Sequence, residues 1–173
     1  TASLREKMFR EMRSKEIFRK AEAAAFAYAD GIAAQKAFPD GTALAGLAAF
    51  DEPLPEKGEA PDKVLDMLVE SGAPATIAQT GGRYFGFVNG GVVPTALAAK
   101  WLADFWDQNA ALHLTSPIAA KLEAVCENWL REIFGLPETT VAGFVSGSSM
   151  AIFSGIAAAR FRLLENLGWD VNK

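Results

Sequence analysis

Cysteine and histidine are nearly absent from this chain of 173 residues, which contains one of each. A single cysteine excludes an intrachain disulfide, and one cysteine with one histidine cannot supply the spaced ligand set of a zinc site. We therefore expect no metal. Cys126 lies among apolar residues of a predicted helix, and no sequence feature pairs it with His113. We interpret it as a small buried hydrophobic residue rather than a nucleophile.

A strong excess of positive charge and a long apolar run are also lacking. The formal net charge is -4, which gives no electrostatic reason to expect a nucleic-acid partner. No apolar run reaches the length of a membrane span, and the first residues do not resemble a signal peptide. We therefore expect no membrane partner and a cytoplasmic location. Half of the residues are apolar and 22% are charged, which is typical of a folded domain with a core.

Capping residues and apolar periodicity predict helices in the first half of the chain. Ser3 and Glu6 have the spacing of a capping box. Apolar residues recur at helical intervals from residue 17 to residue 32. Residues 38–61 are rich in proline and glycine, so we expect mostly loop there, with one short helical turn.

Two further helices are predicted in the second half. One covers residues 95–109 after a proline. The other begins at Ser116 and Pro117 and ends at Gly135. Its apolar residues recur at helical spacing, so we expect them to form a buried stripe: Ile118, Leu122, Val125, Trp129 and Ile133.

The most informative segment is an apolar run, Val141–Val145, followed by a Gly/Ser turn and a helical pattern from Met150 to Leu167. A strand, a small-residue loop and a helix start together present backbone N–H groups and hydroxyls to a phosphate. The loop is neither a nucleotide P-loop nor a dinucleotide fingerprint, because neither glycine pattern is present. One strand cannot pair by itself. Either another chain supplies further strands, or this polypeptide is a piece of something longer.

Aromatic residues alternate with glycines in a second unusual segment, residues 83–91. A core-packing loop with tight turns is the interpretation that composition favours. The alternative is a pocket wall where backbone approaches a ligand closely.

Three segments together suggest a family. Residues 83–94 combine aromatics with glycines, residues 115–137 contain Thr-Ser-Pro, Leu-Glu, Asn-Trp-Leu and Gly-Leu-Pro, and residues 143–160 contain Ser-Gly-Ser-Ser and Ala-Ala-Ala-Arg. In this order and spacing they resemble the pyridoxal-phosphate-dependent decarboxylases of the aromatic amino acid, glutamate and histidine type, called group II. The resemblance extends from about residue 74 to residue 173.

The resemblance implies a fold-type-I enzyme, whose large α/β/α domain contains a mostly parallel sheet. This chain would be mostly α. It would supply an N-terminal helical segment, residues 1–113, that clasps the partner subunit of a homodimer. Residues 114–173 would contribute the first strand, loop and helix of the large domain.

The resemblance also implies a cofactor, pyridoxal 5′-phosphate, and an amino acid substrate that loses carbon dioxide. Gly147, Ser148 and Ser149 match the positions that hold the cofactor phosphate. The resemblance places four residues near the substrate pocket, although a structural or interface role is the favoured interpretation of the last: Phe87, Val88, Asn89 and His113. Departures from the family pattern at Met150 and Ile152 affect the far side of the loop rather than the anchor.

No residue of this chain matches the family's Schiff-base lysine. Eight of the nine lysines precede the Gly/Ser loop, and the ninth, Lys173, is the last residue. We therefore expect an N-terminal part of a carboxy-lyase that has no catalytic residue of its own and is inactive alone. The alternatives are a non-catalytic association fragment, and an enzyme of the same fold with aminotransferase or carbon–sulfur lyase activity. The particular amino acid is not identified.

Overall fold

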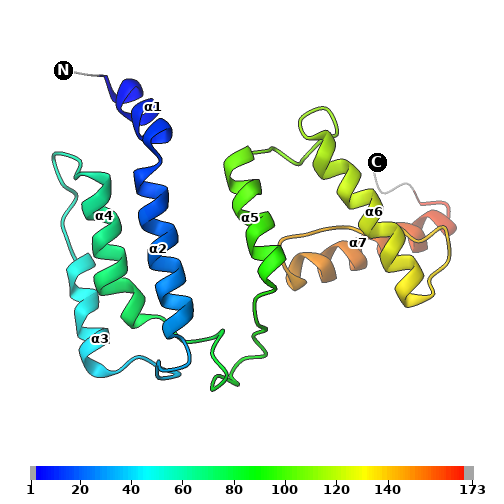
Figure 1. The fold of residues 1–173 in the computed structure, drawn as a ribbon. Coiled ribbons are helices and arrows are strands. Elements are labelled where there is room, and N and C mark those ends of the chain that lie inside the picture. The colour runs from blue at the N-terminus through cyan, green and yellow to red at the C-terminus, as the bar shows by residue number, and fades with distance from the viewer. Residues whose placement is uncertain (1–2, 170–173) are drawn as a thin grey trace. The chain divides into compact units, whose positions relative to one another are not determined.

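The computed structural model describes residues 3–169 of the chain. Within those residues the regular structure is entirely helical (Figure 1). The chain divides into two units, Thr1–Leu97 and Ala98–Lys173. The predicted domain boundary near residue 113 concerns the whole enzyme and stays a prediction.

The first unit begins with two helices separated by one left-handed residue. Helix α1, Leu4–Ser14, has the predicted capping box, in which the Ser3 hydroxyl accepts from the Glu6 N–H at 3.2 Å and the Glu6 carboxylate accepts from the Ser3 N–H at 2.7 Å. Lys15, with φ 59°, ends α1, and α2 follows over Glu16–Gly31. A left-handed non-glycine residue breaks the helical path, so the two segments are distinct helices.

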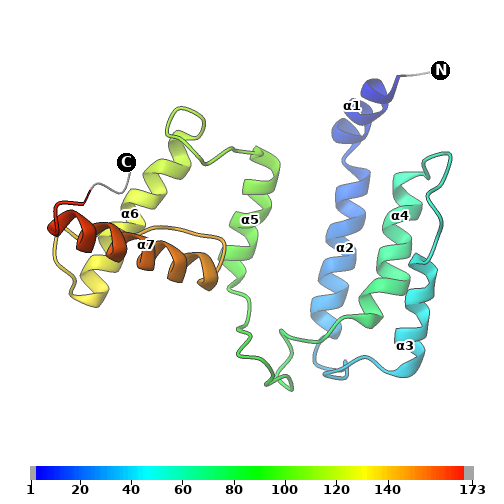
Figure 2. The same ribbon diagram turned by 180° about the vertical axis from the view of Figure 1, so that it is seen from behind.

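Helix α2 packs against α4, Pro61–Met67, and both views show the two side by side (Figure 2). The covered face differs slightly from the predicted one. Lys20 is partly covered, and its ammonium lies 2.5 Å from the Asp66 carboxylate and donates to the Asp62 carbonyl at 3.2 Å. Ala21, one of the apolar residues at helical spacing between residues 17 and 32, is exposed.

Short helical pieces connect α2 to α4 and follow it. Helix α3, Gly41–Gly46, continues into a 3₁₀ turn, Leu47–Phe50, so the short helix predicted in the proline-rich region is confirmed. After α4 the chain forms a π-helical turn, Leu68–Gly72, and a 3₁₀ turn, Ala73–Ala75.

Two loops of the first unit are connected by hydrogen bonds to backbone carbonyls. The Ala78 N–H donates to the Ala37 carbonyl at 3.2 Å, and Ala78 is only 3% exposed. The Arg83 guanidinium donates to the carbonyls of Ala33, at 2.9 Å, and Gln35. Gly81 suits this close approach, because a Cβ atom there would lie 3.3 Å from the Ile32 carbonyl oxygen.

The second unit contains most of α5, Pro94–Trp106, followed by α6, Pro117–Phe134, and α7, Ser148–Asn166. The predicted ends of α6 are confirmed. Ser116 is fully buried and accepts from the Ala119 N–H at 3.4 Å, and Gly135 adopts φ 60° at the C-terminus. The N–H of Leu136 bonds to the Arg131 carbonyl at 2.9 Å, which completes a Schellman motif.

Two expectations for this unit were wrong for the chain as it stands. Residues 141–145 form no strand, because a strand requires a neighbour and none exists in the described part of the chain. The predicted stripe of α6 is not buried: Leu122 is 53% exposed, Trp129 60% and Ile133 72%. Apolar spacing identifies a helix face that is stabilised by burial against another element. The residues described here include no element that buries this face.

Candidate functional site

The predicted phosphate loop lies at the beginning of α7, as the sequence indicated. Gly147 precedes the helix, and Ser148 and Ser149 are its first two residues. All three are exposed. The structure therefore brings the three predicted cofactor-binding residues together at one helix N-terminus.

The N-terminus of α7 has backbone donors without intrahelical partners. The first helical hydrogen bond runs from Ala151 to the Gly147 carbonyl at 3.1 Å, which leaves the N–H groups of Ser148, Ser149 and Met150 directed outward. Gly147 provides no side-chain cap, and the first turn contains no acidic residue. Free N–H groups, two hydroxyls and the positive end of a helix dipole suit an anion such as phosphate.

A segment before this loop is held against α6 by two side chains that the sequence analysis did not single out. The chain turns back along α6 after Gly135. The Arg131 guanidinium donates to the carbonyls of Glu138 at 2.7 Å and Thr140 at 3.4 Å. The Glu127 carboxylate accepts from the Ala142 N–H at 3.1 Å. A Glu and an Arg four residues apart on a helix were the available signal, but a local ion pair was the simpler explanation.

Phe87, Val88 and Asn89 form a tight turn in the first unit. Phe87 and Val88 have φ values of 56° and 57°, and their side chains are 91% and 103% exposed. The Asn89 N–H bonds to the Gly86 carbonyl at 3.3 Å, and its side-chain amide lies 3.4 Å from the Tyr84 hydroxyl. The favoured interpretation as a core-packing loop is wrong for Phe85 and Phe87, whose side chains are 92% and 91% exposed. The left-handed conformation is strained for a β-branched residue such as Val88.

His113 belongs to the second unit, in the turn between α5 and α6. It is exposed, and the described residues make no hydrogen bond or ion pair with its ring. Its neighbours Leu112 and Thr115 close the turn, with the Thr115 hydroxyl donating to the Leu112 carbonyl at 3.0 Å. Within the described residues, no hydrogen bond or ion pair gives the His113 ring a catalytic partner.

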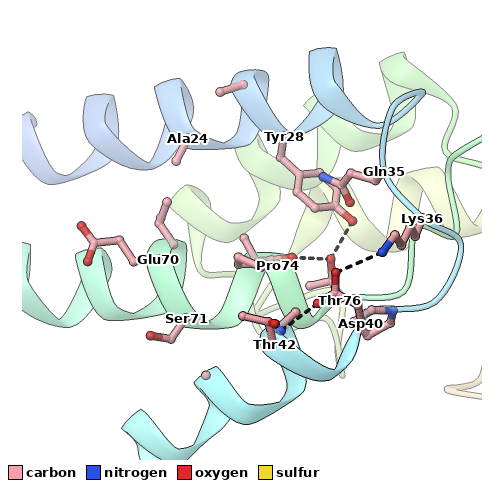
Figure 3. Close-up of a pocket in the computed structure, with 16 residues that line it drawn as sticks. Ala24, Tyr28, Gln35, Lys36, Asp40, Thr42, Glu70, Ser71, Pro74 and Thr76 are labelled. Atoms are coloured by element: carbon pink, nitrogen blue, oxygen red, sulfur yellow. Dashed lines mark hydrogen bonds and ion pairs between the residues drawn. The ribbon is translucent and has the colours of Figure 1, made fainter.

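A groove of 870 Å³ lies between α2, α3 and the turns after α4 in the first unit (Figure 3). Four of the polar side chains that line it are joined in two pairs. The Tyr28 hydroxyl lies 2.8 Å from that of Thr76, which itself donates to the Ala73 carbonyl at 2.8 Å. The Lys36 ammonium donates to Asp40 at 3.1 Å. These pairs hold the loop and α3 in place, so we assign the groove a structural role.

Asp40 is the one residue in the described part of the chain whose pKa clearly departs from its ordinary value. Its carboxylate accepts from the Ala43 N–H at 3.0 Å, and this hydrogen bond, together with the Lys36 ammonium, lowers the pKa of Asp40 below its ordinary value of 3.8. The arrangement is an N-cap of α3. A carboxylate held in its charged form by a helix terminus indicates structure rather than acid–base chemistry.

The described residues offer neither a metal-binding cluster nor a membrane-spanning helix. Residues 3–169 contain no cluster of three or more acidic, histidine or cysteine side chains that could hold a metal ion. No helix in that range has both the length and the apolar character needed to cross a membrane.

Comparison with known proteins identifies the family. Residues 47–169 match the model of the pyridoxal-dependent decarboxylase conserved domain, which is more than half of the chain. The chain belongs to the group II pyridoxal-phosphate-dependent decarboxylase family, and the cofactor of that family is pyridoxal 5′-phosphate. The predictions of family and cofactor are confirmed.

A curated relative agrees with this assignment. The chain is 27% identical over 115 residues to an aromatic-L-amino-acid decarboxylase from Bacillus atrophaeus. The aligned part is 66% of this chain and 24% of the relative, so the chain spans about a quarter of the length of that protein. No solved structure matches the chain.

Proposed function

We propose that this chain contributes the phosphate-binding end of the cofactor site in a pyridoxal-phosphate-dependent enzyme that decarboxylates an amino acid. The observation that supports it best is the uncapped, exposed N-terminus of α7, with Gly147, Ser148 and Ser149 at its first turn. Family membership supplies the cofactor, and the helix terminus has the donors that a phosphate requires.

The donor set at α7 fits a phosphate group. The N–H groups of Ser148, Ser149 and Met150 and the two serine hydroxyls are all donors, and the first turn has no acidic side chain to repel an anion. These residues would bind the phosphate and thereby orient the ring attached to it. When bound, the cofactor supplies an electron sink for the electrons left behind as carbon dioxide departs.

The reacting groups of the enzyme would lie outside these residues. No lysine follows the loop at a position matching the family's Schiff-base lysine. The one later lysine, Lys173, comes only 24 residues after Ser149 (173 − 149), too early for that match. We propose that the 173-residue chain holds the cofactor phosphate but does not itself decarboxylate an amino acid.

The fold-type-I architecture is part of the same proposal. Residues 141–145 would become a strand only beside the strands of a complete large domain, and the exposed face of α6 would be covered there. Met8 at 58% and Phe9 at 53% exposure leave an apolar face on α1. This face supports a homodimer formed through the N-terminal helical segment, residues 1–113, with residues 114–173 beginning the cofactor domain.

The turn at Phe87, Val88 and Asn89 is proposed as a wall of the substrate pocket. Its two apolar side chains are exposed in a strained backbone conformation, which suits a surface that meets another group. His113 is proposed only as an interface or pocket contact of the dimer. Aminotransferase and carbon–sulfur lyase activities have no specific support from these residues, and a cytoplasmic location remains an expectation.

The phosphate site can be tested with Ser149→Asp. An acidic residue is favourable in the first turn of a helix, so α7 should persist, while the new carboxylate repels a phosphate. The probe is pyridoxine 5′-phosphate, which has no aldehyde and cannot react with lysines. We expect its affinity for the chain, measured by fluorescence titration, to fall about tenfold or more.

Ser154→Asp is the matched control, because it adds the same charge in the middle of the same helix. It should leave the affinity for pyridoxine 5′-phosphate within about twofold, a difference of less than 0.5 kcal/mol. Equal affinities of the wild-type chain and Ser149→Asp would show that the phosphate is not held at this helix terminus.

A further inference from the structure

We propose that Glu127 and Arg131 are positioning residues for the phosphate loop. They form a latch on α6 that fixes where the returning chain enters the loop at Gly147. The inference rests on the proposed function of that loop. Neither residue would touch the cofactor, since both act on the segment that leads to it.

The contacts of the latch converge on one short segment. Arg131 donates through one nitrogen to two carbonyls, those of Glu138 and Thr140, and through the other to the Asn128 side chain. The same guanidinium lies 3.6 Å from the Glu127 carboxylate. Glu127 in turn accepts from the Ala142 N–H at 3.1 Å. One ion pair therefore binds three backbone groups within residues 138–142.

The latch is more enclosed than the other ion pairs of the described chain. The side chains of Glu127 and Arg131 are each 26% exposed, whereas those of Arg162 and Glu165 on α7 are 72% and 52% exposed. Partial burial weakens screening by water and strengthens charge-assisted hydrogen bonds. Arginine suits the role because its planar fork can reach several acceptors at once, which a lysine ammonium cannot do in the same geometry.

The position of the latch in the chain explains why it would matter for the phosphate. Residues 143–146 make no backbone hydrogen bond within the described part of the chain, and α7 begins two residues later, at Ser148. The last fixed point before the loop is Ala142. Loss of that point would leave the Gly147–Ser149 donors attached to α6 only through a longer, freely moving tether, and their ordering would cost more entropy when an anion binds.

The test compares Arg131→Met with Arg162→Met in the 173-residue chain. Both changes remove an arginine paired with a carboxylate in the second unit, but only the first removes contacts to residues 138–142. Two affinities are measured for each chain: that for pyridoxine 5′-phosphate and that for pyridoxine, which lacks the phosphate. Amide hydrogen exchange over residues 138–150 is recorded as well.

We expect Arg131→Met to weaken binding of pyridoxine 5′-phosphate about tenfold while pyridoxine binding stays within about twofold. Exchange should accelerate at the Thr140 and Ala142 amides, which are hydrogen-bonded in this segment, and not within the centre of α6. Arg162→Met should change neither. A general loss of structure would instead weaken both ligands together and accelerate exchange throughout the unit.

Glu127→Gln provides a second variant that keeps the side-chain shape and one acceptor oxygen. It should lower the preference for pyridoxine 5′-phosphate over pyridoxine and accelerate the amide exchange, each by a smaller factor than Arg131→Met. If Arg131→Met does not fold, Glu127→Gln is the variant that tests the latch. Unchanged exchange at 138–150, or an unchanged preference for the phosphorylated ligand, would overturn the latch. A wild-type chain with no such preference would refute the proposed phosphate site itself.

Discussion

At the scale of single residues, Asp40 connects a local sequence signal to a measurable property. Its carboxylate caps α3 through the Ala43 N–H and also accepts from Lys36. Both contacts favour the charged form and lower the pKa of Asp40 in the folded chain. The folded state is therefore stabilised by this group at pH values above its unfolded pKa. That contribution is lost as pH falls through the lower folded pKa.

Replacement of Asp40 by alanine should consequently destabilise the chain at pH 7 and not in strong acid. We expect a lower urea midpoint for Asp40→Ala than for the wild type at neutral pH. The difference should shrink once the pH falls below 3.8 and disappear below the folded pKa. Urea unfolding followed by circular dichroism at several pH values measures this.

Asp51→Ala is a suitable control, because Asp51 is exposed and closes a 3₁₀ turn through its backbone N–H, which an alanine retains. Its midpoint should track that of the wild type at every pH. If the difference between Asp40→Ala and the wild type were the same at pH 7 and in strong acid, the carboxylate charge would have no part in the cap.

At the scale of helices, two glycines of the second unit have opposite roles. Gly135 adopts φ 60° in the Schellman motif that ends α6, where an alanine would be strained. Gly155 lies inside α7, and a Cβ atom there would meet nothing within 4 Å. Glycine therefore stabilises the structure at the first position and weakens it at the second.

The two alanine variants should accordingly change stability in opposite directions. Gly135→Ala should lower the free energy of unfolding by about 1 kcal/mol, the cost of a left-handed alanine. Gly155→Ala should raise it by about 0.5–1 kcal/mol through helix propensity. Denaturant unfolding of both variants beside the wild type measures the changes. The same sign for both would mean that backbone conformation does not determine the effect.

At the scale of the whole molecule, the chain exposes far more surface than compact units of its size. Its accessible area is 14498 Å². Two separate compact units with the lengths found here would together expose roughly 10,000 Å². The excess is present however the units are placed. Much of it is apolar, including the faces of α1 and α6, and such surface favours association.

We expect the 173-residue chain to self-associate at micromolar concentration, with the apolar face of α1 at the interface. Met8 is 58% exposed on that face, beside Leu4 and Met12 at helical spacing. Met8→Glu should weaken association about tenfold, because it places a charge where the methionine would be buried in the interface. Sedimentation velocity across a concentration series measures the association constant.

Ala23→Glu is the matched control, since it adds the same charge on an exposed position of α2. It should leave the association constant within about twofold. Equal weakening by the two variants would indicate a general charge effect. A monomer at every concentration would contradict a dimer formed through the N-terminal helices.

The sequence by itself determined the features that depend on neighbouring residues. The capping box at Ser3, the start of α6 at Ser116 and its end at Gly135 each need only a few consecutive residues. The spacing of three motifs was likewise sufficient to indicate the decarboxylase family, which the match over residues 47–169 confirmed. Caps and motifs are local, so the chain contains all the information that specifies them.

The tertiary structure alone decided the features that depend on distant residues. It showed that residues 141–145 remain unpaired and that the stripe of α6 remains exposed, because pairing and burial require a second element. It also brought Ala142 to Glu127, fifteen residues earlier in the chain, and gave the Glu127–Arg131 pair a backbone segment to hold. A sequence specifies which side chains can form such contacts, but only the folded path of the chain decides which of them meet.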